Sequence, residues 1–276
     1  RLDISVPPIR LPIKGKVQLG NKFSIDAVLA TGTVSLSSVP EWIAKGGFEA
    51  GNLELSLDVK GKDRDWHSWK TTGWLALSNG LVNAKEGPIQ DLYVRLLLVR
   101  DAAELKRLSF RLLDSDMAIE GTIRNWATKP GITAKIESNQ MDIDLLIPKG
   151  QRAPIRDFLE WLAATSKVSA TASIARGHYK HLKFGGLSGR ITIQDGVLDL
   201  DRVSGQSTNG EVAGRIVVQL PPKQPADAEL SVRATGLLVE DVLKFFGPKG
   251  GVVTGEARVT GTNRGHGKKL NGLYPT

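Results

Sequence analysis

Residues 53–59 spell LELSLDV, in which an aliphatic residue occupies every second position and a polar residue each position between. The same alternation recurs in residues 168–174 (VSATASI), and apolar residues of one parity recur in residues 212–220. A period of two places successive side chains on opposite faces of a strand, so these runs predict antiparallel strands with one apolar and one polar face. About 16 such strands fit the chain, more than the roughly ten beyond which an open twisted sheet curls or splits.

The chain also shows internal repetition. Residues 30–51 (ATGTVSLSSVPEWIAKGGFEAG) align without gaps with residues 234–255 (ATGLLVEDVLKFFGPKGGVVTG), and a weaker copy begins near Asn139. A unit of roughly 100 residues predicts a stack of like elements, each contacting mainly its neighbours. We therefore expect one continuous segment over residues 1–276. Its approximate units are residues 1–46, 47–150, 151–249 and 250–276.

Two Asx-Gly dipeptides mark a second repeated element. Residues 73–84 (GWLALSNGLVNA) align with residues 189–200 (GRITIQDGVLDL), which places Asn79-Gly80 opposite Asp195-Gly196. Such a dipeptide between alternating runs favours a two-residue hairpin, because a type I′ turn needs positive φ at both central residues. A hairpin is expected at each dipeptide.

Helical periodicity is confined to three short segments, residues 40–45, 153–164 and 239–246. The middle one is clearest, with Pro154 at its start and apolar residues at spacings of three and four. So little helix leaves a long sheet without a helical covering layer. The sheet must fold on itself as a sandwich, which periodicity alone favours, or curl into a trough with its apolar face inside.

Composition excludes several classes of protein. The 276 residues are 41% hydrophobic and 24% charged, as in globular proteins that bury a core. The net charge of +8 permits an anionic partner, but the Lys and Arg residues are dispersed, as on a solvated surface. The absence of cysteine excludes disulfides and thiolate metal sites. The densest apolar run, residues 96–99, is far shorter than a membrane-spanning helix of roughly 20 residues.

No metal site is expected. His178 and His181 form an H-x-x-H motif, but residues three apart on a strand point to opposite faces. Asp195, Asp199 and Asp201 lack the glycine-rich period of calcium-binding repeats.

Enzyme and nucleic-acid functions are not expected either. The glycine pairs at residues 46–47 and 250–251 follow short helices, so they lack the following helix N-terminus that binds phosphate. Aromatic residues are 6% of the chain and form no basic stacking stripe. We predict no catalytic residues and no cofactor. A chain that starts at Arg1 and ends in GLYPT is expected to be a segment of a larger protein.

Five motifs follow one another between residues 184 and 265. They are DGVLDL (195–200), NGEVAG (209–214), PADAEL (225–230), DVL (241–243) and GGVVTG (250–255). In this order and spacing they resemble the C-terminal repeat of the AsmA family, and the internal repeat extends the resemblance weakly over residues 32–121. Members are large bacterial envelope proteins with an inner-membrane anchor and a curled periplasmic sheet that holds an apolar groove.

The resemblance implies a periplasmic segment that carries phospholipid, or another acyl-chain lipid, between the inner and outer membranes. The fold expected is all-β: a long, curled antiparallel sheet built from repeats, with three short helices and a groove. The alternative function is a scaffold whose sheet edges pair with strands of an outer-membrane client.

Shared parity within the alternating runs selects the expected groove lining. It comprises Leu55, Leu57, Leu77, Leu96, Ile119, Ile174, Ile193, Leu200, Ile216 and Leu230. The aromatics expected at the groove edge are Trp42, Phe158, Trp161, Phe245 and Phe246. Another interpretation is that these aromatics close the core where strands end.

Overall fold

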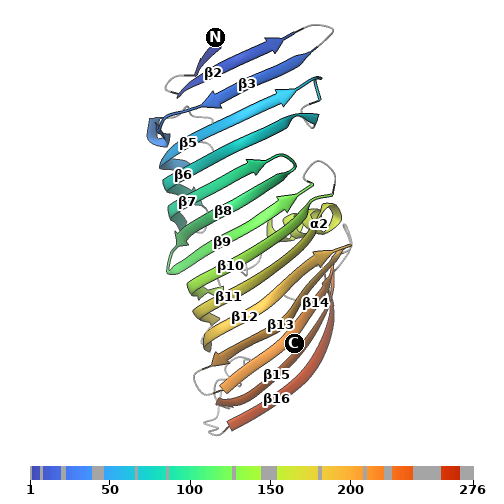
Figure 1. Ribbon diagram of the computed structural model, residues 1–276. Coiled ribbons are helices and arrows are strands. Elements are labelled where there is room, and N and C mark those ends of the chain that lie inside the picture. Colours follow the sequence, from blue (N-terminus) through green and yellow to red (C-terminus); the bar gives the residue numbers. More distant parts are fainter. Residues whose placement is uncertain are drawn as a thin grey trace. The chain divides into compact units, whose positions relative to one another are not determined.

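A computed structural model describes most of the chain. The described residues are 2–6, 9–19, 23–38, 47–65, 68–84, 87–125, 129–143, 154–179, 182–207, 210–220, 226–238 and 256–267. They fall into two compact units, residues 1–130 (unit 1) and 131–276 (unit 2). Both units consist mainly of strands, which confirms the all-β prediction (Figure 1).

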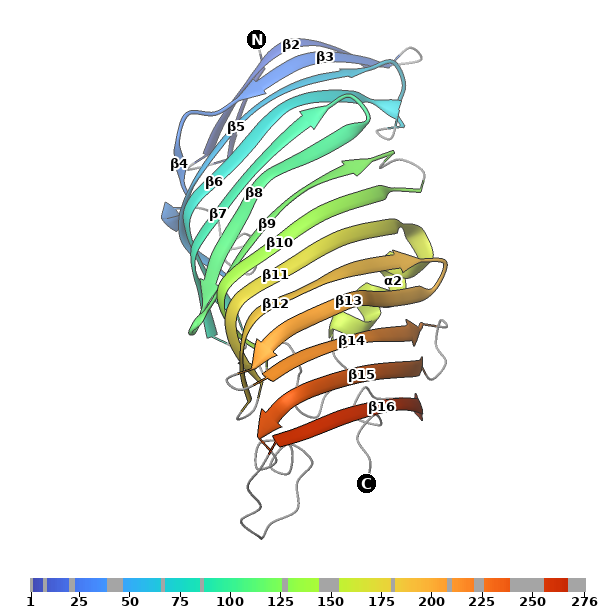
Figure 2. The same cartoon turned by 60° about the horizontal axis from the view of Figure 1, so that its bottom comes forward.

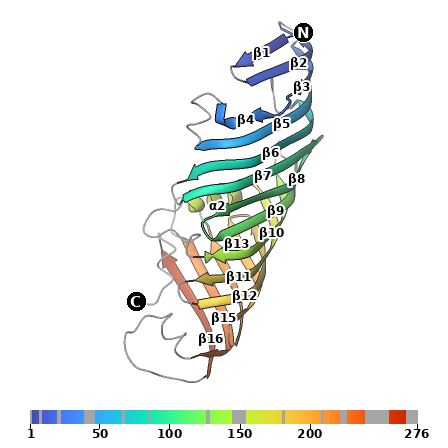
Figure 3. The same ribbon diagram turned by 90° about the vertical axis from the view of Figure 1, so that its left-hand side faces the viewer.

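Unit 1 is an antiparallel meander. Its described strands are β1 (Leu2–Val6), β2 (Ile9–Gln18), β3 (Ser24–Ala30), β4 (Val34–Ser35), β5 (Phe48–Gly61), β6 (Lys70–Ala84), β7 (Gly87–Val99), β8 (Ala102–Leu112) and β9 (Ser115–Arg124). They lie side by side in chain order, except that the short β4 pairs with β5 off this path (Figure 3). Neighbours in sequence are therefore neighbours in space, as short connections favour.

β-Bulges interrupt the register of β5 to β8. On β6 the register shifts between Leu77 and Gly80, and on β8 between Leu105 and Leu108. An extra residue bends a strand and increases its twist, and β5 to β8 curve along their length in Figure 2. Asn79, with φ of 52°, lies at the β6 bulge. The prediction of a hairpin at Asn79-Gly80 is wrong. The positive φ that this dipeptide tolerates is used in a bulge instead of a turn.

Unit 2 is antiparallel with one exception. Its described elements are β10 (Gly131–Asp142), α2 (Pro154–Thr165), β11 (Lys167–Tyr179), β12 (Leu182–Gln194), β13 (Val197–Ser207), β14 (Gly210–Gln219), β15 (Ala226–Leu238) and β16 (Glu256–Gly267). β10 and β11 pair in parallel, so the expectation of a purely antiparallel sheet is wrong at this pair. A parallel pair needs a long crossover connection, usually helical, and α2 lies in it.

One α-helix, α2, occurs in the part of the chain that the structure describes, where three had been expected. It matches the helix predicted over residues 153–164. Residues 40–45 and 239–246 lie outside the described residues. A short 3-10 helix, η1 (Leu36–Ser38), stands shortly before the first of these segments.

The hairpin expected at Asp195-Gly196 is confirmed. These two residues connect β12 to β13 with φ of 50° and 80°. The aligned residues 73–84 instead form part of the single strand β6. The two segments therefore differ in structure, and the proposed repeat is not reproduced at this point.

Replacing Gly196 with alanine should lower the free energy of unfolding by about 1 kcal/mol, because an L-residue at positive φ is strained. The added methyl group would lie 3.8 Å from the Leu220 carbonyl oxygen, so the effect is conformational and not steric. Gly131→Ala is the matched control, since it has neither positive φ nor an atom within 4 Å of the new Cβ. Urea unfolding measures both variants. Equal losses would contradict the turn assignment.

Candidate functional site

Three rows of mostly apolar residues cross the sheet of unit 1. The first row is Val34, Leu53, Leu77, Val94, Leu108 and Ile119. The second is Leu55, Leu75, Leu96 and Leu105. The third is Leu29, Leu57, Gly73, Leu98, Ala103 and Ile123. Residues directly opposite one another on neighbouring strands share a face, so the rows form one surface, the apolar face of unit 1.

This apolar face is incompletely covered. Within the three rows, Leu77 and Ala103 are buried, whereas the other aliphatic side chains are only half-buried. Leu36 of η1 approaches the face near Leu77, because a Cβ added at Gly51 would lie 3.3 Å from a methyl carbon of each. Apart from η1 and β4, the described elements of unit 1 are the strands of the sheet itself. Most of the face therefore has no second described layer.

The opposite face of unit 1 is mixed and largely polar. On β5 it carries Glu54, Ser56 and Asp58, which alternate with the leucines of the apolar face. Asp58 forms an ion pair with Lys60 at 3.7 Å, and Glu104 forms one with Lys106 on β8. The alternation seen in the sequence thus becomes a two-sided sheet.

Unit 2 covers part of its own apolar face with α2. Leu162 and Ala163 of the helix pack in a buried cluster with Val168, Ile193 and Val218 of three strands. Figure 2 shows the helix beside β12 and β13. The Ala163 carbonyl accepts a hydrogen bond of 3.4 Å from the Gly196 amide, which ties the helix to the β12–β13 turn. This end of the face is a conventional protein core.

The expected lining residues are distributed over both units. Leu55, Leu57, Leu77, Leu96 and Ile119 all lie on the apolar face of unit 1. In unit 2, Ile216 stands opposite both Leu200 and Leu230, and Ile174 stands opposite Leu187. Ile193 is 3% exposed and packs near α2, so its side chain already has a protein environment. Contact of any of these residues with lipid stays a prediction.

The expected groove-edge aromatics are described only in part. Trp161 lies on α2 and is 55% exposed, and Phe158 lies on the same helix. Trp42, Phe245 and Phe246 lie outside the described residues. Trp161 is exposed, whereas the adjacent Leu162 is buried. The helix is therefore anchored by Leu162, and Trp161 faces solvent.

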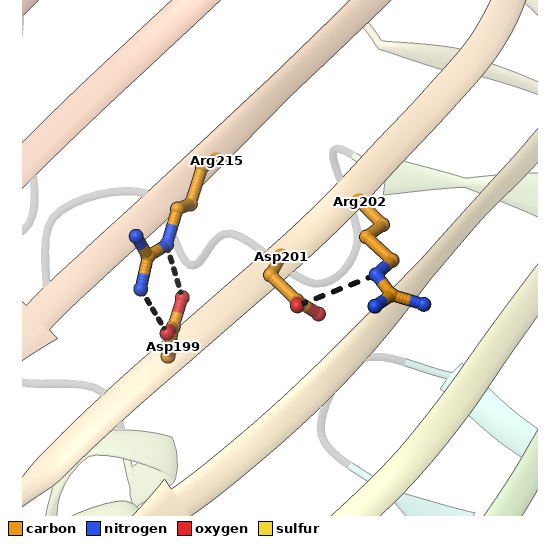
Figure 4. A network of polar contacts seen from close by, with 4 residues as sticks. All are labelled: Asp199, Asp201, Arg202 and Arg215. Carbon is orange, nitrogen blue, oxygen red and sulfur yellow. Dashed lines mark hydrogen bonds and ion pairs between the residues drawn. The ribbon is translucent and has the colours of Figure 1, made fainter.

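Sequence reasoning missed a polar network on the other face of unit 2. Arg215 of β14 donates to Asp199 of β13 through Nε to Oδ1 at 3.0 Å and through Nη2 to Oδ2 at 2.5 Å (Figure 4). Asp201 and Arg202 approach at 3.8 Å beside it. The hydrogen bond from Arg215 lowers the pKa of Asp199 below its ordinary value, burial opposes the shift, and the Arg215 charge reinforces it. Only the strand register could have revealed this pairing.

Asp199→Asn should destabilise unit 2 at neutral pH but not in strong acid. A carboxyl whose pKa is lower in the folded state stabilises the fold above its unfolded pKa of about 3.9 and loses that effect as pH falls through the folded pKa. Urea midpoints of the parent chain and the variant should therefore differ at pH 7 and converge near pH 2. A difference that stays constant would show that the ion pair does not contribute.

A second missed pair links the two parallel strands. His178 Nε2 of β11 lies 3.3 Å from Asp142 Oδ1 of β10. His181, the other histidine of the H-x-x-H motif, is outside the described residues. No group of three potential metal ligands occurs among the residues that the structure describes. Nor do these residues include a helix of the length and apolarity needed to cross a bilayer.

No family model, curated protein or solved structure matches this chain. The apolar face of unit 1 is the described surface whose chemistry bears most directly on function. Its chemistry is non-directional contact with another apolar surface, since the three rows offer aliphatic side chains without charged or hydrogen-bonding groups among them.

Proposed function

We propose that this chain holds acyl chains of a lipid against the apolar face of unit 1. The observation that carries the proposal is the incomplete burial of three in-register rows of Leu, Val and Ile residues. Aliphatic surface exposed to water is unfavourable by roughly 25 cal/mol per Å². A large contiguous apolar patch is typical of a surface that binds a partner.

The acyl chains of a lipid require an apolar surface of this kind. At about 0.8 kcal/mol for each buried CH₂, a two-chain phospholipid needs an extended apolar surface to leave a membrane. Rows that cross at least four strands supply such a surface without a polar interruption, while the polar headgroup can remain in water. We further propose that the bulges curl this sheet around its apolar face into a groove.

The resemblance to the AsmA family supports a specific setting for this activity. We propose a periplasmic segment of a larger envelope protein that moves phospholipid between the inner and outer membranes. Apolar contact requires no catalytic group, metal or cofactor, so the proposal is a carrier and not an enzyme.

Photo-crosslinking at single positions tests the proposal directly. A photoreactive residue at Leu55, Leu57 or Leu96 should capture phospholipid, whereas one at Glu54 or Ser56 on the other face should not. Ile193 and Ile216 are less suitable positions because both belong to or pack against the core near α2. Native mass spectrometry of the purified chain should show bound phospholipid. Equal labelling of both faces would contradict the assignment.

The scaffold remains a second candidate, and it would use the strands at the two ends of the described order. Among the described strands, β1 pairs with β2 alone and β16 with β15 alone. An open edge can pair with a strand of another chain. A scaffold predicts that proline substitutions on β1 or β16 abolish function, while charges on the apolar face leave it intact.

A further inference from the structure

One rim of unit 1 combines basic, aromatic and exposed aliphatic residues. The end of β2, the start of β3, the end of β5, the start of β6 and the β7–β8 turn lie there, because Ile25 stands opposite Gly61 and Gly73 stands opposite Leu98. The Asn125 amide donates to the Asp101 carbonyl at 3.0 Å, which brings the end of β9 to the same rim. This surface is called the basic rim.

Basic residues outnumber acidic ones at the basic rim. The exposed basic residues are Lys16, Lys60, Lys62, Arg64, Lys70, Arg100 and Arg124, against the acidic residues Asp26, Asp58, Asp63, Asp65 and Asp101. Asp26 stands opposite both Lys16 and Lys60, and Asp58 forms an ion pair with Lys60. Asp63 is engaged within its own loop, where its Oδ1 accepts from the Ser68 hydroxyl at 2.6 Å and from the Asp65 amide at 3.0 Å.

The opposite rim of the same unit has the reverse balance. Its described charged residues are Glu49, Asp114 and Asp116 with the single cation Arg111, which forms an ion pair with Asp91 at 2.6 Å. Among the described residues of unit 1, positive charge is therefore concentrated at one end of the strands.

Apolar groups accompany the charge at the basic rim. Leu19, directly after β2, is 78% exposed, and Val17 and Val99 are also exposed. Phe23 and Trp69 stack with ring centroids 5.8 Å apart and planes 12° from parallel. The Trp69 indole N–H donates to the Asp63 carbonyl at 2.9 Å, so the ring pair is fixed to the β5–β6 loop.

We infer that the basic rim binds the surface of an anionic phospholipid bilayer. Lys and Arg near such a surface each strengthen binding, and amphipathic aromatic rings are favoured at the level of the headgroups. Exposed aliphatic side chains add burial at the boundary of the acyl region. The rim has all three groups together, whereas the opposite rim has an exposed leucine without the positive charge.

The geometry of the aromatic pair favours a membrane over nucleic acid. Single-stranded nucleic acid binds by stacking its bases on exposed ring faces. In the basic rim one face of Phe23 and one face of Trp69 are occupied by each other. The other exposed apolar side chains of the rim, Val17, Leu19 and Val99, are aliphatic, which suits acyl chains and not bases.

Flotation of the whole chain with vesicles tests this inference. The chain should float with vesicles of mixed phosphatidylcholine and phosphatidylglycerol and not with phosphatidylcholine alone, and binding should weaken as salt rises. At roughly fivefold in affinity for each basic residue, Lys62→Glu combined with Arg64→Glu should reduce binding by at least about 25-fold. Leu19→Asp should weaken binding as well.

The matched controls alter the same chemistry elsewhere. Lys106→Glu combined with Arg107→Glu makes the same change of charge on β8, and Leu113→Asp places the acid on the opposite rim, where Leu113 is 56% exposed. Both controls should bind nearly as the parent does, and circular dichroism should show every variant folded. Failure of the parent to float, or equal loss in rim and control variants, would overturn the inference. So would retention by single-stranded DNA without flotation.

This inference does not depend on the carrier proposal. A rim that binds vesicles in a chain without co-purified phospholipid would support the membrane contact and reject the carrier. Bound phospholipid in a chain that does not float would support the carrier and reject the membrane contact.

Discussion

Leu55→Asp should remove bound phospholipid from the purified chain almost completely. Leu55 stands opposite Leu75, and Leu75 stands opposite Leu96, so the aspartate would interrupt the second row at β5. An unpaired charge held against acyl chains costs several kcal/mol, and each 1.4 kcal/mol corresponds to about tenfold in affinity. We expect a loss of at least about a hundredfold, measured as phospholipid per chain by native mass spectrometry and by titration with a fluorescent lipid.

The lipid-free variant should still fold. Leu55 is only half-buried, so a carboxylate at this position can remain hydrated when no lipid is bound. Ser56→Asp is the control, since it adds the same charge at the next residue on the opposite face. It should retain lipid. Equal loss in both variants, or normal lipid content in Leu55→Asp, would reject the apolar face as the binding surface.

Leu162→Ala should lower the free energy of unfolding of unit 2 by about 2–4 kcal/mol. The side chain is 8% exposed and belongs to the buried cluster that joins α2 to the sheet. Removing a buried leucine side chain loses its transfer free energy and leaves a cavity, and such changes cost about 2–5 kcal/mol. Urea unfolding followed by circular dichroism measures the loss.

Trp161→Ala is the companion variant, because it truncates a larger but exposed side chain on the same helix. Its effect on stability should stay below about 1 kcal/mol. A small effect at Leu162 would mean that the packing of α2 against the sheet contributes little to stability. A large loss for Leu162→Ala with a small one for Trp161→Ala would identify α2 as a fixed cover of the sheet.

The alternating leucines were sufficient to predict the strands and the two faces of unit 1. The apolar face of β5 can be predicted from Leu53, Leu55 and Leu57 alone, without knowing which strands pair. A period of two indicates a strand and also shows which of its side chains share a face. In-register rows could not be derived, since they depend on which residue of the next strand stands opposite. The bulges near Gly80 and Lys106 shift that register, and no sequence signal marks the second.

The errors at Asn79-Gly80 and at β10 have separate causes. Asn79 and Asp195 both adopt positive φ. A bulge and a turn each use a residue with positive φ, so an Asx-Gly dipeptide alone does not distinguish a bulge from a turn. The direction of pairing between β10 and β11 depends on where the crossover returns the chain. The alternating pattern of a strand does not indicate whether its neighbour runs parallel or antiparallel. Pairs such as Arg215 with Asp199 follow only once the register is known.

The order of strands along the chain has a consequence for folding rate. In unit 1 most strands can pair with the one just synthesised, so hairpins can add one at a time with little loss of chain entropy at each loop closure. The pair of β10 with β11 is different, because residues 143–166 must close a crossover before the two strands meet. This step should be the slow phase of unit 2. Formation of α2 shortens the segment to be closed, so the helix contributes to folding speed as well as to stability.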